Sequence, residues 1–404
     1  MTKMEWLSIV GIGEDGAAGL GETARAAVAG ADAVFGGARH LALAAPLIRG
    51  PALPWPSPFS DAYPAVLARR GTPVAVLASG DPFCFGVGAR LAALLPAGEW
   101  RAFPAPSAFA LARARLGWAA EETATISFCG RPLAAVAPLL QPGARVLALS
   151  ADASTPEALA ALLAARGFGT TLMRVMEALG GAAERVREAT AAGFGLADIH
   201  PLNLVAMEVE AEADARVLPL ASGLPDALFE HDGQFSRREM RALTLSALAP
   251  RRGETLWDVG AGSGSVGVEW MLRHPANRAV AIERDGVRAA RIVRNAEALG
   301  VPGLRIIEGA APEALEGLPP PDAVFLGGGA HIPGAIDAAW AALPPGGRIV
   351  ANAVTLETEA TLLAARARLG GTLSRIAIER LDKVGPMHAY RPAMTVTQWA
   401  AEKP

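Results

Sequence analysis

A glycine-rich turn in the second half of the chain is the strongest local signal of a ligand site. Residues 256–267 read LWDVGAGSGSVG, an apolar strand that runs into glycines and then into a helix. Glycines let the backbone turn sharply and approach a ligand closely. Nineteen residues after Gly264 the next strand ends at Glu283, whose carboxylate could accept hydrogen bonds from both hydroxyls of a ribose. This spacing is typical of sites for adenosine-containing cofactors.

Two kinds of cofactor fit the turn. Gly262, Gly264 and Gly267 satisfy G-x-G-x-x-G, so a nicotinamide-dependent enzyme must be weighed against a methyltransferase that uses S-adenosylmethionine. The strand also carries Asp258, which favours the methyltransferase because an acidic residue there can take the ammonium or ribose side of a cationic methionine conjugate and would repel a pyrophosphate. A purely structural glycine turn is the third interpretation.

Composition excludes several other classes of function. The formal net charge of −3 leaves no basic excess for nucleic acid. Scattered histidines and two cysteines predict no metal site. We expect no membrane partner and a cytoplasmic protein, because no apolar run reaches the roughly 18 residues of a span and the first residues lack a signal-peptide core. Three of the 37 cationic residues are lysine, and the arginines could pair bidentately with a carboxylate-rich substrate or reflect only a GC-rich coding sequence.

The length of 404 residues fits two domains. Short apolar runs alternate with alanine-rich helical stretches, a pattern that predicts an α/β protein with parallel sheets covered by helices. An acidic and then Pro-, Gly- and Ser-containing segment without clear period separates the halves, so we predict domains 1–212 and 224–404 joined by a linker, 213–223. The last strands, near 373–379 and 394–398, have no helical stretch between them and should form an antiparallel hairpin.

The second half resembles the decarboxylating branch of the precorrin C-methyltransferases of cobalamin biosynthesis, from about Leu224 to the C-terminus. Besides the glycine turn, the resemblance is carried by DGQFSRREMR at 232–241, AIER at 281–284, EGAAPEAL at 308–315, PDAVFLGG at 321–328 and NAVTLE at 352–357. It implies a Rossmann-like class I methyltransferase fold.

The same resemblance implies the cofactor contacts of this half. They are Ser236, Gly260, Ala261, Gly262, Ser263, Gly264, Glu283, Ala310 and Ala311. Ser236 stands where the family usually has threonine, and it keeps the hydroxyl. Our candidates for the decarboxylation, all expected in loops at the carboxyl edge of the sheet, are Arg237, Arg238, His331, Asn352 and Glu357.

The first half resembles the tetrapyrrole methylase family over roughly residues 5–210. Its glycine-rich strand ends, VGIGEDG at 10–16 and LASGDP at 77–82, could each be a ligand loop or a plain turn when taken alone. With PAPSAF at 104–109 they carry the resemblance, which implies a two-lobed fold. Expected cofactor contacts are Gly13, Gly80, Asp81 and Ser107. Glu14 stands where the family's first loop usually has proline.

The order of the two halves implies one fused enzyme with two S-adenosylmethionine sites. By resemblance, it methylates meso carbons 5 and 15 of precorrin-6B and removes carbon dioxide from the acetate on carbon 12, giving precorrin-8. The second half is expected to methylate carbon 15 and decarboxylate, and the first half to methylate carbon 5. We expect a homo-oligomer. The alternatives are a nicotinamide-dependent reductase of the same pathway and a module that only carries tetrapyrrole.

Overall fold

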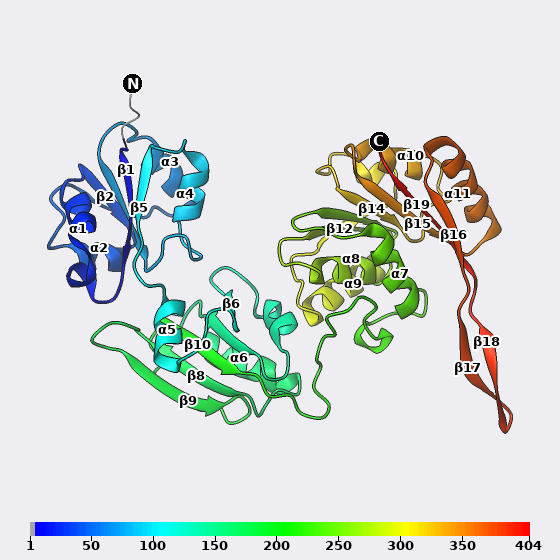
Figure 1. Ribbon diagram of the computed structural model, residues 1–404, viewed down its shortest axis with the longest axis horizontal. Coiled ribbons are helices and arrows are strands. Elements are labelled where there is room, and N and C mark those ends of the chain that lie inside the picture. Colours follow the sequence, from blue (N-terminus) through cyan, green and yellow to red (C-terminus); the bar gives the residue numbers. More distant parts are fainter. Residues whose placement is uncertain (1–4) are drawn as a thin grey trace. The chain divides into compact units, whose positions relative to one another are not determined.

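A computed structural model describes residues 5–404 and divides the chain into two compact units (Figure 1). The N-terminal unit comprises the chain up to Leu133 together with residues 141–216, and the C-terminal unit comprises residues 134–140 and 217–404. Both units are α/β, as predicted, and they have different sheets. Within residues 5–404, none of the helices has the length and apolar character that a membrane crossing requires.

The first sheet of the N-terminal unit is parallel, in the order β3-β2-β4-β1-β5. Along β1, Leu7 and Ile9 join one apolar core while Val10 and Ile12 join another on the opposite face. Figure 1 shows α1 and α2 on one face and α3 and α4 on the other. The elements are β1 Leu7–Ile12, α1 Glu22–Ala29, β2 Ala33–Gly36, α2 Ala38–Ala44, β3 Ala52–Pro54, α3 Ala62–Leu67, β4 Val74–Ser79, α4 Gly88–Leu94 and β5 Trp100–Phe103.

The second sheet of this unit is mixed, which corrects the prediction of parallel sheets throughout. Its order is β6-β7-β10-β8-β9, and only the β6–β7 pair is parallel. Strand β9 is the edge strand of this sheet and pairs with β8. Its residues are exposed or half-buried, so this edge is partly solvated. The elements are α5 Ala108–Leu116, β6 Thr123–Ser127, β7 Arg145–Leu149, α6 Thr155–Ala165, β8 Leu172–Glu177, β9 Arg185–Thr190 and β10 Asn203–Glu208.

The C-terminal unit is built on one sheet in the order β13-β12-β11-β14-β15-β19-β16. Its pairs are parallel from β13 to β15 and antiparallel from β15 to β16. Leu256 and Trp257, neighbours on β11, enter separate apolar cores on the two faces of the sheet. The elements are α7 Arg238–Leu248, β11 Thr255–Val259, α8 Ser265–Leu272, β12 Arg278–Glu283, α9 Gly286–Ala298, β13 Arg305–Glu308, β14 Ala323–Leu326, α10 Ala335–Ala342, β15 Arg348–Ala353, α11 Leu356–Leu369, β16 Thr372–Ile376 and β19 Val396–Glu402.

The predicted final hairpin is confirmed only in its pairing. β16 and β19 are antiparallel, but the chain between them forms a separate two-stranded ribbon, β17 Glu379–Val384 and β18 Met387–Pro392. Every residue of the two ribbon strands is exposed, and Figure 1 shows the ribbon extending away from the sheet. Because the ribbon has no buried face, its residues show no apolar alternation and no pattern in the sequence predicts its strands.

Candidate active site

The glycine-rich turn lies at the carboxyl edge of the C-terminal sheet, between β11 and α8. Gly260, Gly262 and Gly264 have φ angles of +71°, +60° and +73°, which side chains rarely adopt. A Cβ on Gly260 would lie 3.0 Å from the backbone nitrogen of Gly328, in the loop after β14. Strand β11 lies between β12 and β14 in the sheet. The loops after β11 and β14 therefore meet at the position where the strand order reverses. Open α/β sheets bind ligands at this position.

Asp258 stabilises the glycine turn from the protein interior. Its Oδ2 accepts a hydrogen bond of 2.9 Å from the backbone nitrogen of Gly267, and its side chain is buried. Burial raises the pKa of the Asp258 carboxyl to about 7. Asp258 is not on the lining of the cavity beside the turn, and its contact with the cofactor stays a prediction.

Glu283, at the end of β12, is buried behind the same turn. Its Oε2 accepts a hydrogen bond of 2.8 Å from the backbone nitrogen of Gly262, and its Oε1 accepts one of 3.1 Å from Asp285. Each carboxylate oxygen has a further lone pair. The carboxylate therefore fixes the position of Gly262, and its contact with a ribose stays a prediction.

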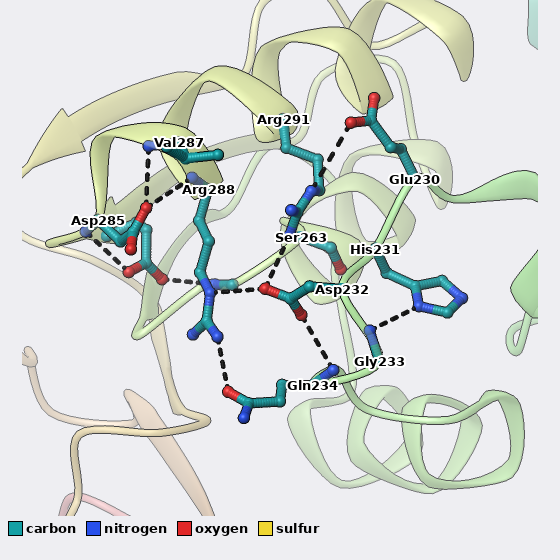
Figure 2. A network of polar contacts seen from close by, with 12 residues as sticks. Glu230, His231, Asp232, Gly233, Gln234, Ser263, Asp285, Val287, Arg288 and Arg291 are labelled. Carbon is teal, nitrogen blue, oxygen red and sulfur yellow. Dashed lines mark hydrogen bonds and ion pairs between the residues drawn. The ribbon is translucent and has the colours of Figure 1, made fainter.

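A loop preceding α7 forms one wall over the turn, and Figure 2 shows how α9 holds it. The Asp232 carboxylate accepts hydrogen bonds from Arg288 Nε at 2.9 Å and from the Gln234 backbone at 3.0 Å, and lies 3.0 Å from Arg291 Nη1. The hydrogen bond from Arg291, foremost, lowers the pKa of Asp232 to about 2. The Gln234 carbonyl lies 3.6 Å from where a Cβ on Gly262 would stand.

A cavity of about 670 Å³ lies between this loop, the glycine turn and the root of the ribbon, which comprises residues 376–380 and 393–396. This volume falls in the range of small-molecule sites. Its lining includes Ser236, Arg237, Met240, Gly260, Ala261, Gly262, Arg288, Phe325, Gly328, Asn352, Ile376, Ile378, Arg380, Met394 and Val396. Four of the predicted cofactor residues, Ser236, Gly260, Ala261 and Gly262, are thus brought together.

The other predicted cofactor residues of this half lie around the cavity and not on its lining. Ser263 is buried, and Gly264 precedes α8, where a Cβ would lie 2.6 Å from Ile292 Cγ2. Ala310 is exposed and Ala311 is buried in the loop after β13. These residues shape the turn and its surroundings.

Two of the five decarboxylation candidates line the cavity. The Arg237 guanidinium lies 5.1 Å from the centre of the Phe235 ring. The Asn352 amide is held at both ends, because its Nδ2 donates to Thr244 Oγ1 at 2.9 Å and its Oδ1 accepts from Gln398 Nε2 at 3.0 Å. Asn352 therefore presents one fixed orientation.

The remaining three candidates lie elsewhere. Arg238 donates through Nε to the Gly223 carbonyl at 2.9 Å. His331 is exposed in the loop after β14, and Glu357 is exposed in the first turn of α11. None of the three is on the cavity lining, and none has support from the geometry.

Sequence reasoning missed four polar residues of this site. Thr244 and Gln398 orient Asn352, and Gln398 stands directly opposite it in the β15–β19 pairing. A correct register for the last strand could have found Gln398. Arg288 and Arg380 line the cavity from α9 and the ribbon, and no local pattern in the sequence marks them.

The N-terminal unit has a smaller cavity at the corresponding glycine turns, about 70 Å³, lined by Gly13 and Gly80 among others. Asp81 is not on it, and its carboxylate accepts from the Phe83 backbone at 2.9 Å. Ser107, also off the lining, caps α5 by accepting from the Ala110 backbone.

A cluster of polar side chains stands at this small cavity. Arg39 forms an ion pair with Glu14 and donates to Ser79 Oγ at 2.9 Å, and His40 Nε2 lies 2.8 Å from the same hydroxyl. Burial, followed by the nearby charge of Arg39, lowers the pKa of His40 to about 4. Glu14 and Arg39 therefore neutralise one another on the cavity lining.

Two family models match the chain. Residues 7–194 match the tetrapyrrole (corrin/porphyrin) methylases, and residues 227–403 match the precorrin methyltransferase domain. The second region lies in the C-terminal unit, and the first lies in the N-terminal unit except for residues 134–140.

Similar proteins of known name cover either the whole chain or its second half. The precorrin-6Y C(5,15)-methyltransferase [decarboxylating] of Sinorhizobium sp is 56% identical over 98% of this chain and 96% of its own length. A protein of the same name from Mycobacterium tuberculosis is 41% identical over 98% of this chain and 99% of its own. The cobalt-precorrin-6B C(15)-methyltransferase (decarboxylating) of Salmonella typhimurium is 34% identical over 42% of this chain and 88% of its own.

Proposed function

The chain belongs to the family of decarboxylating precorrin C(5,15)-methyltransferases, and on that premise we propose how its two halves divide the reaction. The enzyme methylates carbons 5 and 15 of precorrin-6Y with decarboxylation. In our proposal the C-terminal half methylates carbon 15 and removes carbon dioxide from the acetate on carbon 12. The N-terminal half methylates carbon 5, so that the product is precorrin-8. Family membership decides against the nicotinamide-dependent reductase and the tetrapyrrole carrier.

The likeness of the C-terminal half to a separate enzyme carries this division. The aligned region covers 88% of the Salmonella protein, whose name contains carbon 15 and the decarboxylation but not carbon 5. The second methylation then falls to the N-terminal half, whose match is to the tetrapyrrole methylases. The domain limits 1–212 and 224–404, with the linker 213–223, are part of the same proposal.

The C-terminal cavity fits S-adenosylmethionine. Its volume of about 670 Å³ is ample, and the Gly260 and Gly262 backbone faces it without side chains. When bound, the cofactor supplies a methyl group on a sulfonium, which is a strong electrophile. The backbone from Gly260 to Gly262 and the Ser236 hydroxyl would hold it, with Glu283 fixing the turn from behind.

The protein's contribution to methylation is alignment and exclusion of water. A meso carbon flanked by pyrroline nitrogens is enamine-like and already nucleophilic, so little general base is needed. Apolar side chains of Met240, Phe325, Ile376 and Val396 line the cavity and keep water from the reacting carbon. Correct alignment of the reacting atoms can contribute up to about 7–11 kcal/mol.

For decarboxylation, the macrocycle itself takes up the electrons of the broken carbon–carbon bond through a conjugated ring imine, and a proton then adds to the exocyclic carbon, which becomes a methyl group. Arg237 and Asn352 are the candidates with geometric support, because both lie on the cavity. In this role the fixed Asn352 amide orients the acetate carboxylate, and Arg237 binds it by charge. Arg238, His331 and Glu357 stay predictions from the sequence.

The N-terminal cavity of about 70 Å³ does not fit a molecule of this size as it stands. A cavity needs roughly 10–15 Å³ of such volume to hold one water molecule, so this one has room for a few waters only. We therefore derive no step through a cofactor there, and the second cofactor site, with Gly13, Gly80, Asp81 and Ser107, rests on the family alone. A homo-oligomer likewise stays a prediction, which light scattering on the purified protein tests.

Gly262→Val in the full chain tests the division of labour. The new side chain enters the cavity from a backbone with φ of +60°, so we expect methylation of carbon 15 and loss of carbon dioxide to fall about 100-fold. Methylation of carbon 5 should persist. Mass spectrometry of the product then finds one added methyl group and every carboxyl group retained.

Gly253→Val is the matched control, because Gly253 has a φ of +82° and lies off the cavity. It adds the same backbone strain and should leave both methylations in place. Loss of carbon dioxide by the Gly262→Val enzyme at the normal rate would contradict the assignment of decarboxylation to the C-terminal half.

A further inference from the structure

The charged residues that line the C-terminal cavity are all cationic. They are Arg237, Arg288 and Arg380, and within residues 5–404 the lining includes no aspartate or glutamate. A cavity lined by charges of one sign attracts a ligand of the opposite sign. The guanidinium fork matches carboxylates in particular.

The first two arginines already serve the wall of the cavity. Arg288 donates to Asp232 at 2.9 Å and to Gln234 at 2.6 Å, contacts that hold the loop in Figure 2. The Arg237 guanidinium lies over the Phe235 ring. A ligand that bound the Arg288 guanidinium would have to replace its hydrogen bonds to Asp232 and Gln234.

Arg380 is differently placed, at the root of the ribbon. Its Nη2 donates to Glu239 Oε2 at 2.5 Å, and the two side chains are 46% and 44% exposed. Glu239 is its one ion-pair partner among the described residues. An exposed ion pair of this kind contributes little to stability, so an entering carboxylate can displace Glu239 and bind the guanidinium bidentately.

An apolar wall continues from Arg380 into the cavity. Ile376, Ile378, Met394 and Val396, from the two sides of the ribbon root, line it, and Met394 is 73% exposed. The backbone nitrogen of Ala393 donates to the Ile378 carbonyl at 2.8 Å, which fixes the two sides together. A flat, conjugated ring with acidic substituents would cover the apolar wall and reach Arg380.

We propose that Arg380 is a substrate-binding residue that holds a peripheral carboxylate of the tetrapyrrole while the ring lies on the wall at the ribbon root. In the free enzyme Arg380 is paired with Glu239, and the substrate carboxylate displaces Glu239 when it binds. This inference rests on the proposed function, because it assigns a binding role for the substrate of the C-terminal half.

The test compares Arg380→Gln with Arg391→Gln in the full chain. Arg391 stands directly opposite Arg380 in the β17–β18 register and pairs with Asp382 at 3.2 Å, but it does not line the cavity. Steady-state decarboxylation of the precorrin is measured by released carbon dioxide. We expect Arg380→Gln to raise KM about tenfold with little change in kcat, Arg380→Lys to recover part of it, and Arg391→Gln to match the wild type.

Glu239→Gln separates binding from a structural role. Removing the competing carboxylate should lower KM about twofold, whereas an ion pair needed only to hold the ribbon predicts a higher KM for both partners' variants. A KM for Arg380→Gln within twofold of wild type, or raised KM in both Arg380→Gln and Glu239→Gln, overturns the inference while wild-type turnover still supports the proposed function. Absence of wild-type turnover overturns both.

Discussion

The two halves place glycine turns at the carboxyl ends of parallel strands, yet they differ in what lies beside those turns. In the C-terminal unit the turn faces a cavity of about 670 Å³, and the carboxylates nearest to it, Asp258 and Glu283, point into the protein and bind backbone nitrogens. In the N-terminal unit the cavity is about 70 Å³, and the Glu14 carboxylate stands on its lining, paired with Arg39.

The difference shows that glycines locate a site and the neighbouring side chains decide whether it is open. A Cβ on Gly11 would lie 1.8 Å from the Gly80 carbonyl, so the N-terminal glycines let two loops approach each other. The C-terminal turn instead leaves Gly262 with no atom closer than 3.6 Å to such a Cβ. In the C-terminal turn Gly260 and Gly264 also allow close packing, and Gly262 is the glycine that leaves space for a ligand.

Glu283→Ala should have the largest effect on this comparison. It removes the acceptor that fixes Gly262 at 2.8 Å, together with the predicted ribose contact. Charge-assisted hydrogen bonds are worth roughly 1.5–3 kcal/mol, so S-adenosylhomocysteine should bind the C-terminal half at least about tenfold more weakly. Isothermal titration calorimetry on the full chain measures this, and methylation of carbon 5 should be unchanged.

Glu308→Gln is the control for Glu283→Ala. Glu308 ends β13 and stands beside Glu283 in the parallel register, but it is exposed. We expect its variant to bind S-adenosylhomocysteine as the wild type does. Equal affinity of the Glu283→Ala protein and the wild type would remove Glu283 from the cofactor site.

The same contrast explains what the sequence could predict. The strand that precedes the glycine turn could be predicted, because residues 256–259 are a buried apolar run that leads directly into glycines. The sequence could not predict Arg380, because the ribbon that carries it has no buried face. Nor could it predict that Asp232 would meet Arg288, 56 residues away, since only the folded loop brings them together.

A smaller effect is expected from Glu14→Ala, which tests whether this side chain closes the N-terminal site. The substitution removes a side chain from the lining and releases Arg39. We expect S-adenosylhomocysteine to bind the N-terminal half about threefold more tightly. Calorimetry in a Gly262→Val background assigns the heat to this half.

Glu22→Ala, in the first turn of α1 and off the cavity, serves as the control for Glu14→Ala. Weaker binding by the Glu14→Ala protein would mean that Glu14 helps to hold the ligand and does not exclude it. Glu14, which stands where the family usually has proline, would then be a ligand-binding residue in this chain.

The smallest expected effect is on the pH dependence of the free energy of unfolding. Two buried carboxyl groups, one in each unit, should contribute to it with opposite signs. Burial raises the pKa of Asp258 from 3.8 to about 7. Burial also acts to raise the pKa of Glu177, but hydrogen bonds from Arg185 and Arg187 outweigh it and lower that pKa from 4.5 to about 2. The cause is the partner, because Asp258 has a backbone amide where Glu177 has two guanidinium groups.

Linkage gives the sign of each contribution to the free energy of unfolding. Between about pH 4 and 7 the folded protein keeps a proton on Asp258 that the unfolded chain releases, so this contribution is present in acid and is lost as the pH rises to 7. Glu177 stabilises above pH 4.5 and loses its contribution as the pH falls toward 2. Asp258→Asn keeps a carbonyl acceptor for Gly267 and should flatten the first dependence, whereas Glu177→Gln should flatten only the second. Urea unfolding at intervals from pH 3 to 8 measures both, and an unchanged slope between pH 4 and 7 in Asp258→Asn would show that this carboxyl is ionised in the folded turn.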